Sequence, residues 1–254
     1  MKRRSFSATS LLACIAATAG AGPKAHRQFY ELRRYLLDSA DGQKALETFF
    51  KDVGIPAFNR AGIRSVGVFK ELEGEGLDLY LLLPFDSLDA FASLSGRLAA
   101  DTTYRTDGAA ILDAGKKNAP FLRMESTLME AFDRLPTLRV PQKKDGRIYE
   151  LRQYESASFT HAQSKVEMFN SGGEIDIFLE TGLDPVFFGR SLSGARLPNL
   201  TYMLSFDDMA AHDANWDAFK QHPEWNRIKA LPQYKGTVSN ITKTFLKATD
   251  YSQI

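Results

Sequence analysis

Hydrophobic and polar positions alternate in two short stretches of the chain that are almost identical. Residues 29–35 read FYELRRY, and residues 148–154 read IYELRQY. A period of two residues is typical of a strand with one face buried. We therefore expect strands over 28–37 and 147–155.

An amphipathic helix is expected after each of these strands. Apolar side chains recur there at helical spacing: Leu46, Phe49, Phe50 and Val53 after the first strand, and Phe159, Val166 and Phe169 after the second. Later patterns predict further strands at 63–70, 78–83 and 121–131, and again at 184–191, 199–206 and 236–247. Asp86 and Asp207 each precede a helical segment that they can cap. Each half of the chain thus has the order β-α-β-β-α-β of a ferredoxin-like module.

The two halves are predicted to be copies of one module. Tyr30 and Tyr149 lie 119 positions apart. Residues 80–86 align with residues 202–207 if one residue is skipped in the second copy, and Tyr80 and Tyr202 lie 122 positions apart. We expect an N-terminal module at 26–134, a linker rich in proline and charge at 135–146, and a C-terminal module at 147–254.

The fold class is therefore α+β, with two tandem modules packed sheet to sheet. In a ferredoxin-like module the helices cover one face of the sheet, and the other face needs a partner. The second copy on the same chain can supply that partner.

Strand alternation divides the first strand of each module into two faces. One face carries charge and tyrosine: Glu31, Arg33 and Tyr35 in the first copy, and Glu150, Arg152 and Tyr154 in the second. The other face is more apolar and includes Tyr30, Leu32, Tyr149 and Leu151. We expect the apolar face to meet the helices and the charged face to look into the space between the two sheets. There the charges either form Glu–Arg pairs that fix how the sheets meet, or line a cavity for a small-molecule ligand.

The second half resembles the NIPSNAP family in several motifs. They are RIYELR at 147–152, PVFFG at 185–189, LPNLTYML at 197–204, HPEW at 222–225 after Trp216 and Phe219, and the closing YSQI at 251–254. The resemblance is close over 146–254 and more distant over 27–132. It implies membership of the dimeric α+β barrel superfamily, which includes small monooxygenases, isomerases and haem-handling enzymes. The NIPSNAP resemblance itself implies no established catalytic mechanism.

Composition excludes several other classes of function. The formal net charge of the 254 residues is +1, so a nucleic-acid partner bound through phosphate neutralisation is not expected. No apolar run reaches the length that spans a membrane. The sequence has no dinucleotide, phosphate-loop or zinc-protease motif, and we expect no cofactor and no metal. A monomer and a homo-oligomer are both compatible with the sequence.

Candidate chemistry gathers near HPEW. His222 and Tyr202 have the residue types of acid–base catalysis, and Trp225 is a candidate ligand contact. Pro223 predicts a helix start, so His222 could equally cap that helix while Trp216 and Trp225 seal the helix layer. His212, four residues after Asp208, is expected on a solvated helix face.

The N-terminus has the form of an export signal over 1–25. Basic residues Lys2, Arg3 and Arg4 precede a short apolar stretch and small residues, and the paired arginines resemble a twin-arginine signal. We therefore expect an exported, bacterial-type, periplasmic protein. Cys14 is the only cysteine, and a lipoprotein anchored through it is the alternative.

Two functions remain open from the sequence. The first is a NIPSNAP-type module that binds a small ligand or a partner in the cell envelope. The alternative is a cofactor-poor monooxygenase or isomerase, with His222, Tyr202, Arg152 and Glu150 lining its site.

Overall fold

The computed structural model describes residues 26–72, 74 and 76–254. The N-terminal half contains β1 (Phe29–Leu36), α1 (Ala40–Phe49), the π-helical turn η1 (Phe50–Gly54), α2 (Ile55–Arg60), β2 (Gly67–Glu71), β3 (Leu79–Phe85), α3 (Leu88–Ala100), α4 (Thr102–Asp107), α5 (Ala109–Leu112) and β4 (Arg123–Ala131). The C-terminal half contains β5 (Ile148–Glu155), α6 (Phe159–Asn170), α7 (Glu174–Glu180), β6 (Asp184–Ser193), β7 (Asn199–Phe206), α8 (Met209–Gln221), α9 (Pro223–Ile228), the 3-10 turn η2 (Pro232–Tyr234) and β8 (Asn240–Ala248). The strand order along the chain confirms the predicted duplication.

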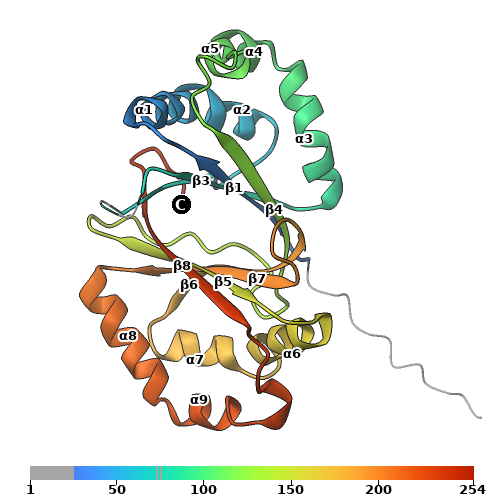
Figure 1. The fold of residues 1–254 in the computed structure, drawn as a ribbon, viewed down its shortest axis with the longest axis vertical. Helices are drawn as coiled ribbons and strands as arrows, with labels where there is room; N and C mark the ends of the chain where they lie inside the picture. Colours follow the sequence, from blue (N-terminus) through green and yellow to red (C-terminus); the bar gives the residue numbers. More distant parts are fainter. Residues whose placement is uncertain (1–25, 73, 75) are drawn as a thin grey trace, which may run out of the picture.

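The two four-stranded sheets join into one closed antiparallel barrel. Within the halves the strand orders are β2-β3-β1-β4 and β6-β7-β5-β8. Strand β4 pairs with β6 and β2 pairs with β8, so neither sheet keeps a free edge. Helices α1–α5 cover one outer side of the barrel and α6–α9 cover the opposite side (Figure 1). The prediction of tandem modules packed sheet to sheet is confirmed.

Apolar side chains from both sheets fill the inside of the barrel. Tyr30, Phe69, Phe187, Met203 and Leu246 lie there, each with at most a trace of exposure. Rings from the two halves meet, with the centroids of Tyr30 and Phe187 5.2 Å apart. The space between the sheets is thus an apolar core.

The predicted orientation of the first strands was therefore wrong. Tyr149 and Leu151 point into the barrel, whereas Glu150, Arg152 and Tyr154 lie on its outer surface beneath the helices. The barrel interior is closed by hydrogen-bonded strands all round, and unpaired charges there are costly. The helix side offers polar partners such as the Trp216 indole, so the charged face lies on that side.

The predicted match between Tyr80 and Tyr202 was also wrong. Arg33 pairs with Leu81 on β3, and Arg152 pairs with Tyr202 on β7, so Tyr202 occupies the place of Leu81. Tyr80 points into the barrel, while Tyr202 points towards the helices. A slip of one residue along a strand moves a side chain to the other face.

Helix starts differ by one residue from the prediction. Ser87 caps α3 and Asp208 caps α8, each accepting a hydrogen bond from a backbone N–H in the first turn. Asp207 instead forms ion pairs with Lys144 and Arg147. Phe159, predicted on the buried face of its helix, is 81% exposed, and the buried face of α6 is formed by Lys165, Met168 and Phe169.

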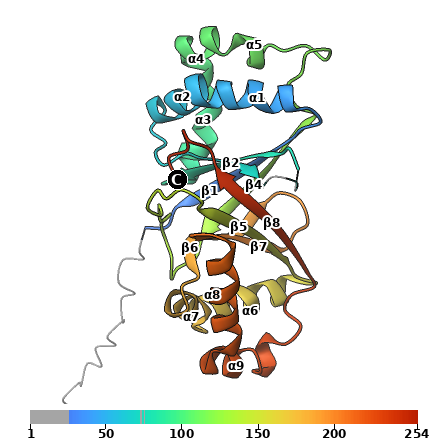
Figure 2. The ribbon, with the colours of Figure 1, turned by 90° about the vertical axis from the view of Figure 1, so that its left-hand side faces the viewer.

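Part of the sequence-based prediction lies outside the described residues. The signal segment 1–25, with Cys14, belongs to that part, and the proposed module boundaries remain predictions. Among the described residues, no helix combines the length and apolar character that crossing a bilayer requires. The two helix layers and the barrel between them are also seen after a quarter turn (Figure 2).

Candidate ligand pocket in the C-terminal module

A pocket of about 590 Å³ opens between strands β5 and β8 and the helices α6–α9. That volume lies in the range of small-molecule sites. Its lining comprises Glu150, Arg152, Tyr154, Lys165, Glu174, His212, Asp213, Trp216, Asp217, Phe219, Lys220, Trp225, Val238, Ile241, Lys243 and Phe245. Aromatic walls and several charged groups therefore face the same space.

Glu150 is the centre of the polar network at this pocket. Its side chain is fully buried and accepts hydrogen bonds from Arg152 Nη1 at 2.6 Å and from the indole Nε1 of Trp216 at 2.9 Å. His212 Nε2 lies 3.4 Å from the same carboxylate. The guanidinium carbon of Arg152 lies 4.4 Å from the centre of the Trp216 ring. These contacts hold the Arg152 guanidinium against one wall of the pocket.

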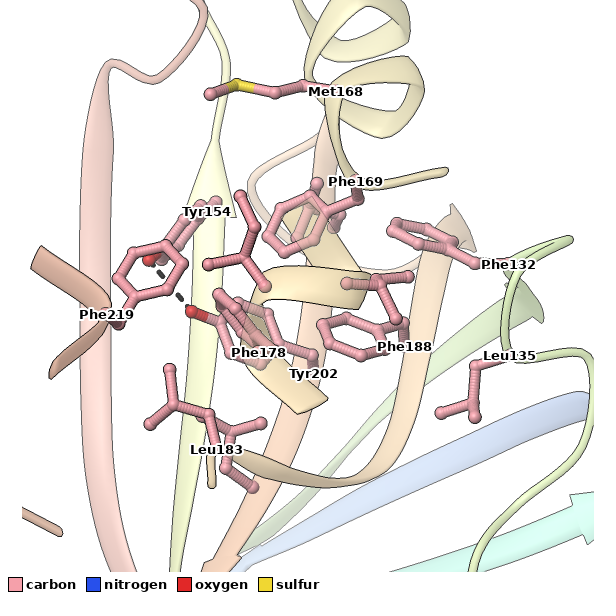
Figure 3. Close-up of a cluster of buried hydrophobic side chains, with 14 of the residues drawn as sticks. Phe132, Leu135, Tyr154, Met168, Phe169, Phe178, Leu183, Phe188, Tyr202 and Phe219 are labelled. Carbon is pink, nitrogen blue, oxygen red and sulfur yellow. Dashed lines mark hydrogen bonds between the residues drawn. The ribbon is translucent and has the colours of Figure 1, made fainter. Parts of the chain in front are cut away.

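Two tyrosines extend this network into the core of the module. Arg152 Nη2 donates to the Tyr154 hydroxyl at 3.0 Å, and the Tyr202 hydroxyl donates to Tyr154 at 2.9 Å. Figure 3 shows this bond among the packed rings of Phe169, Phe178 and Phe188. Burial raises the pKa of both tyrosines above its ordinary value of 10. Both hydroxyls are therefore protonated at neutral pH.

A second buried charge pair forms the far wall. Lys165 Nζ donates to Glu174 Oε2 at 2.7 Å, and the two side chains are 5% and 3% exposed. The ammonium also lies 4.4 Å from the centre of the Phe169 ring and 5.7 Å from that of Trp225. Burial raises the pKa of Glu174, and Lys165 opposes that shift. The pair spans α6 and α7 and fixes their relative position at the pocket.

The structure brings together four of the six ligand-binding candidates. Glu150, Arg152, Tyr154 and Trp225 all line the pocket. Glu31 and Arg33 lie in the other module and form a separate network, in which Arg33 donates two 2.9 Å hydrogen bonds to Glu31 and Ser126 donates one at 2.8 Å.

The two catalytic candidates lie outside the pocket lining. His222 Nδ1 accepts a hydrogen bond from the Glu224 backbone N–H and so caps α9, while its Nε2 lies 3.2 Å from Glu180. Tyr202 is completely buried behind Tyr154. The capping role considered for His222 is thus the one that the structure shows.

Sequence reasoning missed Lys165, Glu174, His212 and Lys243. His212 had been expected on a solvated helix face, but its side chain is 12% exposed and packs edge-on against Phe206 and Phe245. A spacing signal was present, because His212 and Trp216 lie four residues apart on the helix that Asp208 caps. Lys165 likewise precedes the buried Phe169 by four residues.

The pocket residues can be compared with the residues at the equivalent positions of the N-terminal module, the sister copy. Ser39 and Ser158, 119 positions apart, cap α1 and α6, so Lys165 corresponds to the buried Leu46. Ser87 and Asp208, 121 positions apart, cap α3 and α8, so His212 corresponds to Phe91. By strand register, Tyr202 corresponds to Leu81 and Lys243 to Ser126. Three apolar positions of the first copy are therefore polar in the second.

The duplicated ferredoxin-like barrel defines the class of protein. The NIPSNAP family model matches residues 30–132 and 149–253, and the chain belongs to the NIPSNAP family. No curated protein matches the chain.

Solved structures of similar fold support the same architecture. A candidate monooxygenase from Fusobacterium nucleatum has a TM-score of 0.58 at 8% identity, over 88% of this chain and 93% of its own. One from Lactobacillus acidophilus has a TM-score of 0.56 at 10% identity, over 87% and 94%. An anthrone oxidase-like protein has a TM-score of 0.51 at 10% identity, over 89% and 93%. At these identities the similarity shows the fold alone.

Proposed function

We propose that this NIPSNAP protein binds a small molecule in the pocket of its C-terminal module. The observation that carries the proposal is the difference between the two copies. At the interface of sheet and helices, Leu46, Leu81 and Phe91 of the first copy are replaced by Lys165, Tyr202 and His212 in the second. Burying polar groups costs stability, and buried titratable groups cluster at functional sites.

The shape and chemistry of the pocket support this proposal. Charged and hydrogen-bonding side chains converge on a space that also has aromatic walls, formed by Trp216, Phe219, Trp225 and Phe245. Aromatic walls combined with oriented polar groups are found in sites for small organic ligands.

The two tryptophans make the proposal directly testable. The chain contains two, Trp216 and Trp225, and both line the pocket. A ligand that enters the pocket should change the intrinsic tryptophan fluorescence saturably. Native mass spectrometry of gently isolated protein should then show a bound molecule of defined mass, together with the oligomeric state.

A pair of matched variants locates the binding. Val238→Phe places bulk in the pocket that Val238 lines, and should abolish the fluorescence response. Val140→Phe adds the same bulk at an exposed position between the modules and should leave the response intact. A response that survives Val238→Phe, or a clean apo mass with no response to any compound, would count against the proposal.

An enzyme is the second candidate function, and one contact favours it. His212 lines the pocket between two carboxylates, with Nδ1 2.9 Å from Asp213 and Nε2 3.4 Å from Glu150 without a hydrogen bond, and an imidazole is the side chain most often used for proton transfer. The similarity in fold to candidate monooxygenases is compatible with a cofactor-poor monooxygenase or isomerase. His212→Phe introduces the residue of the sister copy and should abolish any turnover, whereas His161→Phe at an exposed site on α6 should not. Turnover unaffected by His212→Phe would refute this assignment.

The proposal includes export to the periplasm, on the basis of residues 1–25. Cell fractionation with intact-mass measurement tests it. We expect a periplasmic protein that lacks the N-terminal segment. A lipid-sized mass increment on Cys14 would instead indicate the lipoprotein, and a cytoplasmic full-length chain would refute export.

A further inference from the structure

The register between β5 and β8 places two cations side by side. Arg152 is directly opposite Lys243 in the antiparallel ladder, and both side chains line the pocket. Directly opposed like charges on neighbouring strands destabilise a sheet. The corresponding pair in the first copy is Arg33 and Ser126, where the serine donates to Glu31 and no repulsion arises.

The other cations of the pocket have carboxylate partners. Arg152 pairs with Glu150, Lys165 with Glu174 and Lys220 with Asp217. His212 Nδ1 lies 2.9 Å from Asp213. Among the described residues, no carboxylate forms an ion pair with Lys243. The wall where β5 meets β8 therefore carries one exposed cation, Lys243, that no carboxylate of the described residues neutralises.

Arg152 also has an unused hydrogen-bond donor. The Arg152 side chain is 10% exposed, and its buried Nε atom lacks an acceptor among the described residues. An unpaired buried donor costs stability until an acceptor reaches it. An anionic group between the Arg152 guanidinium and the Lys243 ammonium would relieve the repulsion between these two cations.

From these contacts we infer that the pocket takes an aromatic carboxylic acid, with its carboxylate at Lys243 and Arg152 and its ring between the aromatic walls. One unneutralised cation matches the single charge of a carboxylate better than the double charge of a phosphate. The walls on either side are Trp216, Phe219, Trp225 and Phe245, which favour a flat apolar body. This inference rests on the proposed function and names the class of its ligand.

Calorimetric titration with a pair of probes tests the inference on the full protein. The probes are naphthalene-2-carboxylate and naphthalene-2-carboxamide, which share shape and differ in charge. We expect the carboxylate to bind at least about tenfold more tightly than the amide, which corresponds to roughly 1.4 kcal/mol. Raising the salt concentration should lower the affinity for the carboxylate and leave the affinity for the amide unchanged.

Two serine variants assign the anion contact. Lys243→Ser introduces the residue of the sister copy. It should lower the affinity for the carboxylate probe about tenfold or more and leave the affinity for the amide probe unchanged. Lys247→Ser removes an equally charged, exposed residue of the same strand that does not line the pocket, and should change neither affinity.

The outcomes separate this inference from the proposed function. If both probes bind equally, or if Lys243→Ser leaves the carboxylate affinity unchanged, the acid inference is wrong while the pocket remains a binding site. If neither probe binds, the acid inference is also overturned. Whether the pocket binds any small molecule is then decided by the tryptophan fluorescence titration and by native mass spectrometry.

Discussion

Lys165 Nζ donates a 2.7 Å hydrogen bond to Glu174 Oε2, and this ion pair is almost completely removed from solvent. In the first module, the position of Lys165 is occupied by Leu46, which is 1% exposed. The same interface of sheet and helices can therefore be packed with an apolar side chain. A charge pair at this depth stabilises the fold poorly compared with apolar packing, which suggests that it is kept for the pocket.

The first prediction concerns the energetics of this pair. Glu174→Leu leaves the Lys165 charge buried without a partner and should lower the free energy of unfolding by about 3–5 kcal/mol. Lys165→Met with Glu174→Leu replaces both charges by apolar groups of similar volume and should be neutral or stabilising. Urea denaturation of the three proteins measures this. A double variant as unstable as the single one would show that the pair itself stabilises the fold.

The second prediction concerns pH. Burial raises the pKa of Glu174 above its ordinary value of 4.5, against the opposing influence of Lys165. The unfolded chain titrates at the ordinary pKa of 4.5, and the folded protein titrates at the raised pKa. Between these two pKa values the folded protein binds more protons than the unfolded chain, so stability should fall as pH rises from 4.5 through the folded-state pKa. Glu174→Gln should remove this fall, and Glu167→Gln, at an exposed position of α6, should retain it. Denaturation midpoints across this pH range provide the measurement, and parallel curves for all three proteins would contradict the prediction.

Strand alternation and the internal repeat were sufficient to predict the order of the strands and two tandem modules packed sheet to sheet. The repeat of YELR around Tyr30 and Tyr149 is local and regular, so it identifies equivalent strands directly. The closure of the barrel through β4–β6 and β2–β8 is not visible in this way, because pairing between modules depends on edges far apart in sequence.

The candidate site was predicted only in part, because the sequence does not show which side chains surround each residue in the fold. Alternation shows that Glu150 and Arg152 share a face, but it does not show which face meets the helices. The deciding contact is the bond from Trp216 to Glu150, which joins strands and helix across 66 positions of sequence. Lys165 and His212 were missed because long polar side chains on a buried helix face look like solvated ones until their partners are known.

The third prediction separates His222 from the pocket. His222 caps α9 through Nδ1, so His222→Ala should destabilise the protein by about 1 kcal/mol without altering ligand affinity. His222→Asn supplies another capping side chain and should recover most of that stability. Thermal unfolding and the tryptophan titration together check this. If His222→Ala loses much of its ligand affinity while its stability is preserved, His222 takes part in ligand binding and the prediction is wrong.

The last prediction tests the seam that closes the barrel. Gly189 on β6 pairs with Ala131 on β4, and a Cβ at Gly189 would lie 2.8 Å from the Cβ of Met129. Met129 is fully buried in the barrel core, so neither side chain can move aside without disturbing the packing.

Gly189→Ala should therefore lower the free energy of unfolding by about 1–3 kcal/mol. Gly96→Ala is the matched control, because a Cβ there meets nothing within 4 Å and the residue lies inside helix α3. That variant should be stabilised by up to about 1 kcal/mol. Urea denaturation of both variants provides the comparison. Because the clash exists only where β4 of one module contacts β6 of the other, an unchanged stability in Gly189→Ala would show that the two modules do not meet at this seam in solution.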